Sequence, residues 1–306
     1  MPFIALKVDV DTLRGTREGV PRLLDLFAHS GISATFLFSL GPDHTGRAIK
    51  RIFRPGFFSK VQRTSVLDHY GLKTLLYGTL LPGPDIGKHC ASIMRSTQVA
   101  GHETGIHTWD HILWQDHVRH RDPPWTVRQI NLAVSRYQEI FGILPHTHGA
   151  AGWQMNDAAL LEFDRLGFRY ASDGRGTAPY YPHVQGQRLT CMQLPTTLPT
   201  LDEMIGLDGV SERNVAQLLL QRTRHTQTDQ VFTLHAELEG GKLLPVFKQL
   251  LLDWREQGYN LGSLSSYYQR LDHGSIAAAS WHWGVLPGRT GEVMMQTQSV
   301  EQTQQP

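Results

Sequence analysis

The sequence is poor in cysteine, which limits how covalent bonds could stabilise the fold. Its 306 residues include two cysteines, Cys90 and Cys191, which lie far apart and outside any spacing that is typical of metal ligands. One disulfide between them is possible, but two thiols in a reducing cytosol fit this usage better. We therefore expect Cys90 and Cys191 to be buried thiols.

Long apolar runs are also missing. The run from Phe3 to Val8 is too short for a signal peptide or a membrane span, and no stretch approaches the roughly 18 apolar residues that a span requires. The net charge of +1 gives no general case for binding nucleic acid. With 40% hydrophobic and 19% charged residues, the chain has the composition of an ordinary globular protein, which we expect to stay in the cytoplasm.

The sequence does contain a regular alternation of strand and helix patterns. Short apolar runs alternate with stretches of helical spacing that end at a glycine, as at Gly31, Gly142 and Gly167. The predicted strands are 3–10, 32–40, 168–171, 190–194 and 231–235, and the predicted helices are 19–30, 126–141, 156–166, 212–224 and 242–257. This order predicts an α/β fold in which helices cover a parallel sheet.

Two acidic residues end the first predicted strand. Asp9 and Asp11 are two positions apart, so their side chains point to the same face of the strand. Much later in the chain, His107 and His111 are four positions apart and share a face if they lie on one helical turn. One carboxylate with two imidazoles is a typical ligand set of a hydrolytic metal site, and it leaves the second carboxylate free to act as a base.

Each of these patterns has an ordinary structural alternative. An Asp-x-Asp pair alone is more often a solvated strand end, and 16 histidines make one His-x3-His spacing expected by chance. His235, at the end of an apolar run, is by itself more often a core histidine than a catalytic one. Glu237 and Glu239 are as readily loop acids as substrate contacts. The order in which the motifs follow one another along the chain favours a catalytic metal site over these alternatives.

In that order the motifs resemble the polysaccharide deacetylase (NodB-homology) family of metal-dependent carbohydrate de-N-acylases, over about residues 3–270. The resemblance implies a distorted, incomplete (β/α) barrel of about seven strands, with the site at the carboxyl ends of the strands. It implies that Asp9 is the catalytic base, that Asp11, His107 and His111 bind one divalent metal ion, and that His235 is the catalytic acid. Mixed nitrogen and oxygen ligands do not choose between zinc, manganese, cobalt and nickel.

Three blocks narrow the resemblance within the family. Residues 8–12, 146–154 and 232–237 are most similar to members that remove the N-formyl group from 4-deoxy-4-formamido-L-arabinose on undecaprenyl phosphate. That step belongs to the modification of lipid A with aminoarabinose, which gives resistance to polymyxin and other cationic peptides. The similarity implies a lipid-linked amino sugar as the substrate. Two alternatives stay open: a de-N-acetylase of another amino sugar, and a non-catalytic relative that binds sugar or lipid.

One block departs from the family pattern. Most members carry an Arg in the third motif that orients the base, and the corresponding block here has none. His146 and His148 are candidates for replacing that contact. Asp173 could orient His235 or could be a turn aspartate, and Trp153 could line the sugar site or belong to the core.

Two further segments stand apart in composition. Residues 47–88, after the second predicted strand, carry eight basic and two acidic residues among aromatic and aliphatic ones. Such an insertion suits an anionic bilayer or a phosphate-bearing lipid, although it could also pack on the barrel with a solvated basic face. The implied substrate favours peripheral contact with the inner membrane. Residues 286–306 are rich in Gln, Thr and Gly and are predicted to be a disordered tail, so the predicted catalytic domain is 1–285.

Overall fold

The computed structural model describes residues 1–48, 74–226 and 228–297, and its central element is the buried strand β1 (Phe3–Val10). One parallel sheet contains β1, β2 (Thr35–Ser39), β3 (Glu103–Thr108), β4 (Thr147–His148), β5 (Tyr170–Ala171), β8 (Met192–Gln193), β9 (Gln230–His235) and β10 (Asn260–Gly262). The sheet order is β10-β1-β2-β3-β4-β5-β8, and β9 pairs with β1.

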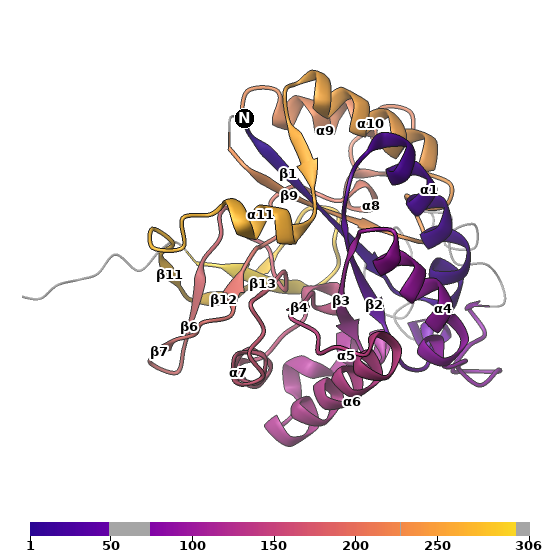
Figure 1. Cartoon of the computed structure of the whole chain (residues 1–306), viewed down its shortest axis with the longest axis vertical. Helices are drawn as coiled ribbons and strands as arrows, with labels where there is room; N and C mark the ends of the chain where they lie inside the picture. The colour runs from indigo at the N-terminus through magenta and orange to yellow at the C-terminus, as the bar shows by residue number, and fades with distance from the viewer. Residues whose placement is uncertain (49–73, 227, 298–306) are drawn as a thin grey trace, which may run out of the picture.

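The sheet curls towards closure but leaves one gap. Within the described residues no ladder joins β8 to β9, and the gap is bridged by the backbone N–H of Thr197, which donates to the carbonyl oxygen of Val231 at 3.1 Å. Helices surround the curled sheet, as Figure 1 shows. The predicted incomplete (β/α) barrel is therefore confirmed.

The helices begin and end where local chemistry dictates. α1 (Val20–Ser30) ends at Gly31 and α6 (Pro123–Phe141) ends at Gly142, both with positive φ, of 61° and 72°. The Asn156 side chain accepts a hydrogen bond from the Ala159 N–H and so begins α7 (Asp157–Arg165). The other helical elements are η1 (Gly15–Gly19), α4 (Ile86–Val99), α5 (His111–His117), η3 (Val118–His120), η4 (Ala151–Trp153), α8 (Leu201–Met204), α9 (Val215–Thr223), α10 (Leu244–Glu256) and α11 (Leu264–Arg270).

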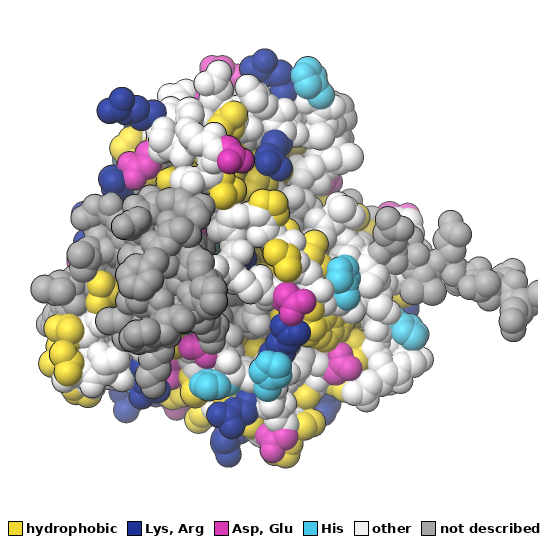
Figure 2. Space-filling view, turned by 180° about the vertical axis from the view of Figure 1, so that it is seen from behind, with side chains coloured by type: hydrophobic (Ala, Val, Ile, Leu, Met, Phe, Trp, Pro, Cys, Tyr) yellow, Lys and Arg dark blue, Asp and Glu magenta, His cyan; other side chains and the backbone are white. Residues whose placement is uncertain are grey.

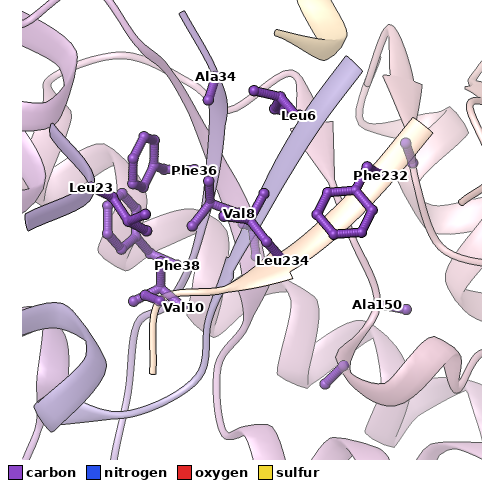
Figure 3. Packing of buried hydrophobic residues seen from close by; sticks show 14 of the residues in the cluster. Leu6, Val8, Val10, Leu23, Ala34, Phe36, Phe38, Ala150, Phe232 and Leu234 are labelled. Atoms are coloured by element: carbon purple, nitrogen blue, oxygen red, sulfur yellow. The ribbon is translucent and has the colours of Figure 1, made fainter. Parts of the chain in front are cut away.

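Side chains of β1 alternate between two environments. One face packs against the surrounding helices and contributes Ile4, Leu6, Val8 and Val10 to the main hydrophobic core. Figure 3 shows Val8 and Val10 near Phe36 and Phe38 of β2 and Leu23 of α1. This continuous apolar contact fixes the register of β1 within the sheet.

The opposite face of β1 points into the barrel. At its amino end, Phe3 and Ala5 pack in a second apolar cluster with residues of β5, β8, β9 and α11. The next residues on this face are Lys7 and Asp9, which are buried as well, and Asp11 follows directly after the strand. The barrel interior therefore changes from apolar to charged towards the carboxyl end of β1.

The C-terminal region differs from the sequence prediction. Strands β12 (Trp281–Val285) and β13 (Glu292–Gln296) form an antiparallel hairpin, and β6 (Tyr181–Val184), β7 (Gln187–Arg188) and β11 (Ala278–Ala279) form a small second sheet. The Arg175 N–H donates to Met294 O, and the Gln296 N–H donates to Arg175 O, both at 2.8 Å. The predicted disordered tail is wrong for residues 286–297, because these backbone pairs dock the hairpin on the barrel. We propose that the catalytic domain extends to residue 297.

The structure also bears on the predictions for the cysteines, for membrane spans and for the insertion 47–88. Cys90 and Cys191 are buried and free, as expected. Within the described part of the chain, every helix is too short or too polar to cross a bilayer. Most of the predicted insertion 47–88 lies outside the described residues, which include only 47–48 and 74–88 of it. On the face shown in Figure 2, Lys and Arg side chains are interspersed with Asp and Glu side chains.

Candidate active site

The carboxyl ends of β1 and β3 bring the three predicted metal ligands together. His107 Nε2 lies 3.2 Å from Asp11 Oδ1, and His111 Nε2 lies 3.4 Å from Asp11 Oδ2. Each residue offers one ligand atom, and the three atoms lie within 4.8 Å of one another. Asp11, His107 and His111 therefore form a cluster that could hold a metal ion.

The two histidines reach this cluster by a route that the spacing did not predict. His107 lies within β3, whereas His111 is the first residue of α5. Between them, the Asp110 side chain accepts a hydrogen bond from the Leu113 N–H at 3.0 Å and starts the helix. The prediction of one shared helical turn is therefore wrong; a strand-to-helix junction brings the two imidazole rings to a centre distance of 5.2 Å.

Hydrogen bonding fixes which nitrogen of His107 faces the cluster. His107 Nδ1 lies 2.6 Å from Gly149 O, and a carbonyl oxygen only accepts, so Nδ1 carries the proton. The lone pair of Nε2 then faces Asp11 Oδ1, a buried oxygen without a hydrogen bond from the described residues. Two acceptor atoms directed at each other fit a cation between them. Burial opposes ionisation, but the charge of His111 holds the pKa of Asp11 well below its usual range.

The other carboxylate is held by a residue that sequence reasoning missed. Lys7 is fully buried, and its Nζ lies 3.2 Å from Asp9 Oδ2 and donates to Ser172 O at 3.0 Å. Asp9 Oδ1 lies 3.8 Å from His107 Nδ1 and makes no hydrogen bond with the described residues. The argument that put Asp9 and Asp11 on one face applies equally to Lys7, two positions before Asp9.

The expected substitutes for the missing arginine have other partners. His148 Nδ1 lies 2.6 Å from Asp173 Oδ1, and His146 Nε2 lies 3.5 Å from Glu103 Oε1. Asp173 Oδ2 also accepts a hydrogen bond from Gln193 Nε2 at 2.8 Å. The hypothesis that His146 or His148 replaces the arginine contact is therefore wrong, and so is the hypothesis that Asp173 orients His235. Asp173 orients His148 within a buried network.

His235 ends β9, in register with Asp9 of β1. Its Nδ1 lies 4.0 Å from Asp202 Oδ1, and its backbone N–H donates to Glu239 Oε2 at 2.7 Å. Burial lowers the pKa of His235, but the negative charges of Asp202, Asp11 and Asp9 outweigh it and raise the pKa to about 9. The imidazole is therefore protonated at neutral pH, as a proton donor must be.

Glu237 supports the segment that carries Asp11. Its Oε1 accepts hydrogen bonds from the Asp11 N–H at 3.2 Å, from the Thr12 N–H at 2.9 Å and from the Thr12 hydroxyl at 2.7 Å. Burial, together with the charge of Asp11, raises the pKa of Glu237 to about 8. A Cβ on Gly15 would fall 1.9 Å from the same oxygen, so a larger residue there would have to displace the Glu237 carboxylate. Sequence alone left Glu237 between loop acid and substrate contact, because no local pattern shows these long-range partners.

Trp153 is almost fully buried, and its φ of 53° is unusual for a large residue. Three cations lie near its indole: Lys7 Nζ at 5.6 Å, the Arg175 guanidinium at 4.9 Å and the Arg289 guanidinium at 4.3 Å from the ring centre. Trp153 therefore acts mainly as a platform for charged side chains.

The family model for polysaccharide deacetylase matches residues 2–171, which is more than half of the chain. The chain belongs to the polysaccharide deacetylase family. A relative from Shewanella sediminis, named "Probable 4-deoxy-4-formamido-L-arabinose-phosphoundecaprenol deformylase ArnD", is 37% identical over 89% of this chain and 87% of its own length. A protein of the same name from Wigglesworthia glossinidia brevipalpis is 30% identical over 94% of this chain and 100% of its own.

Solved structures agree with the polysaccharide deacetylase fold. A crystal structure from Mycobacterium smegmatis, described as a polysaccharide deacetylase, has a TM-score of 0.63 and 15% identity, with 92% of this chain and 94% of that chain covered. A family 4 acetyl xylan esterase from Clostridium thermocellum, solved with a cobalt ion, has a TM-score of 0.51 and 12% identity, covering 87% and 90%. At these identities the likeness supports the fold alone.

Proposed function

We propose that this family member is an amide hydrolase that removes the N-formyl group from 4-deoxy-4-formamido-L-arabinose carried on undecaprenyl phosphate. The observation that carries the proposal is that three kinds of group lie together at one end of the barrel. They are the buried carboxylate of Asp9, the Asp-His-His cluster and the protonated imidazole of His235. The deformylase name of two relatives, each matched over most of this chain, supports the choice of substrate.

The proposed mechanism divides the work among six side chains. Asp11, His107 and His111 would hold one divalent ion, which polarises an amide carbonyl and lowers the pKa of a water molecule. Asp9 takes the proton of the attacking water, and Lys7, 3.2 Å from its Oδ2, holds that carboxylate in position. His235 donates its proton to the departing amine nitrogen. Without this proton the amine is a poor leaving group.

The direct test offers the purified, metal-loaded protein two lipid-linked amino-arabinose substrates, one formylated and one acetylated. We expect released formate and little acetate. Acetate as the main product would favour the de-N-acetylase alternative, and release of neither acid would favour a non-catalytic relative.

The metal assignment predicts a specific loss in His111→Ala. Removing one of three ligands should lower bound divalent metal and reduce deformylation by about 10²-fold or more. Metal content by elemental analysis, measured beside turnover, checks both effects. The matched control is His117→Ala, at the exposed far end of the same helix α5. Full metal occupancy in His111→Ala would contradict the assignment.

We also propose peripheral contact with the cytoplasmic face of the inner membrane through residues 47–88. The support is the excess of eight basic over two acidic residues in that segment and the lipid carrier of the proposed substrate. Binding to anionic liposomes should weaken with added salt and with charge reversal at Arg54, Lys60 and Arg63. Binding that ignores both changes would mean that this segment does not bind the membrane electrostatically.

A further inference from the structure

The hairpin that was predicted to be disordered carries an arginine to the edge of the site. In the turn between β12 and β13, Gly288 has a φ of 78°, and a Cβ there would fall 1.8 Å from the carbonyl oxygen of Glu203. The turn is thus packed directly on α8, which also carries Asp202, the acid beside His235. The residue after Gly288 is Arg289.

The Arg289 side chain is nearly buried, and no described residue accepts a hydrogen bond from its guanidinium. It is 13% exposed, and its only ion pair within the described residues is a long one, 3.8 Å from Arg289 Nη1 to Glu203 Oε1. A guanidinium has five N–H donors, and none of those in Arg289 makes a hydrogen bond to the described part of the chain. Some buried side-chain nitrogen and oxygen atoms have no hydrogen-bond partner, but the guanidinium nitrogens of Arg289 are not among them. Since these nitrogens also make no hydrogen bond to a described residue, they must be accessible from outside the chain.

The neighbouring Arg175 shows the contrast. Its Nη1 donates to both carboxylate oxygens of Glu203, at 3.2 and 3.0 Å, and its Nη2 donates to Leu198 O at 3.0 Å. Arg175 therefore neutralises Glu203 and is bound to the Leu198 backbone. The N–H donors of the Arg289 guanidinium, in contrast, make no hydrogen bond to a described residue. A partly desolvated guanidinium without acceptors is unfavourable unless an anion from outside the chain binds it.

Arg289 also lies close to the reacting groups. Its guanidinium and Lys7 Nζ, which pairs with Asp9, contact the same Trp153 indole. Burial lowers the pKa of Arg289, while the charges of Glu203, Asp202 and Asp11 act in the opposite direction. The guanidinium is therefore within electrostatic reach of the metal-ligand cluster.

The proposed substrate carries its anion on the far side of the sugar ring from the reacting amide. Nitrogen at C4 leaves only a six-membered pyranose ring, so the formamide at C4 and the phosphate at C1 lie on opposite sides of it. An enzyme that holds the formamide at Asp9 and Asp11 must hold the phosphate about one sugar ring away. The fork of an arginine suits phosphate oxygens.

We propose that Arg289, supported on Trp153, binds the phosphodiester that joins the sugar to its lipid carrier. This inference rests on the proposed function and deepens it, since it makes the anionic linkage a determinant of specificity. A neutral glycoside with the same formamide would then be a poor substrate.

Two substrates that differ only in the phosphate test the inference. One is a short-chain phosphodiester of formamido-arabinose, and the other is its methyl glycoside. Arg289→Gln should lower kcat/KM for the phosphodiester by about 10- to 100-fold, mainly through KM, and leave the methyl glycoside within about twofold. Equal loss on both substrates would overturn the inference and make Arg289 a structural residue.

The matched control is Arg119, an arginine of η3 that contacts the same hairpin. Arg119 Nη1 pairs with Glu292 Oε2 at 2.7 Å, and its guanidinium lies 4.2 Å from the Trp283 ring centre. Arg119→Gln removes a comparable arginine–tryptophan contact away from the reacting groups, so its ratio of kcat/KM between the two substrates should match wild type. A changed ratio in Arg119→Gln would show that loosening the hairpin alone produces the effect.

A binding measurement separates this inference from the proposed activity. Geranyl phosphate carries the phosphate and a short prenyl chain but no sugar, so its calorimetric titration needs no turnover. We expect Arg289→Gln to bind it about 10-fold or more weakly than wild type, and Arg289→Lys to lie between them. If the wild type binds geranyl phosphate but releases no formate from the formylated lipid-linked sugar, the proposed function fails and the phosphate site stands. Equal affinities, or no binding by the wild type, would overturn the site.

Discussion

Asp9→Asn is expected to lower kcat for deformylation by about 10²- to 10⁴-fold while the protein keeps its divalent metal. The amide has nearly the shape of the carboxylate but cannot take the proton of the attacking water. Asp9 Oδ1 makes no hydrogen bond with the described residues, so replacing this oxygen breaks no structural contact and the loss is in proton transfer. Turnover and metal content are measured on the same preparation.

The neighbouring carboxylate supplies the comparison. Asp11→Asn should lose both metal and turnover, because Asp11 faces the two histidine nitrogens at 3.2 and 3.4 Å. If Asp9→Asn loses metal as completely as Asp11→Asn, base and ligand have been assigned the wrong way round. A melting curve for each variant excludes unfolding as the cause.

Lys7→Met is expected to abolish turnover and to destabilise the fold by about 3–5 kcal/mol. Methionine fills much the same volume, so the change mainly removes the charge 3.2 Å from Asp9 Oδ2. Asp9 would be left as a buried carboxylate without its cation, and nothing would hold it in place to act as a base. Denaturant unfolding measures the stability and formate release measures the activity. Lys88→Met, at an exposed position of α4, is the control for losing one lysine.

The double variant Lys7→Met, Asp9→Asn separates the two effects. If the buried pair is the cause, removing both charges should restore much of the stability lost in Lys7→Met, while activity stays as low as in Asp9→Asn. Stability losses that simply add would show that Lys7 and Asp9 are not coupled. The hypothesis that Lys7 holds the base would then fail.

Features decided by near neighbours in the chain could be predicted from the sequence. Gly31 ends α1 and Asn156 begins α7, because a left-handed glycine and a capping side chain act within one turn. Alternation along β1 was enough to place Asp9 and Asp11 on one face. The family motifs, which combine distant segments, supplied His107, His111 and His235.

What could not be predicted depends on partners far along the chain. A buried lysine is stable only beside a suitable acceptor, so Lys7 could be interpreted only with Asp9 and Ser172 in place. The segment around Arg289 has a composition typical of disorder, and its order comes from backbone pairing with Arg175, more than a hundred residues earlier. Local propensity carries no information on either contact.

The central position of β1 has a consequence for the newly made chain. This strand leaves the ribosome well before β9 and β10, yet Asp9 is in register with His235, and Phe3 pairs with Asn260. At about 5–20 residues per second, synthesis leaves Lys7, Asp9 and Asp11 without these partners for roughly 10 to 45 s. During that time the charged end of β1 has no barrel in which to be buried. The catalytic groups therefore come together only after β9 has been made, and a chain that is released before β9 lacks the proton donor.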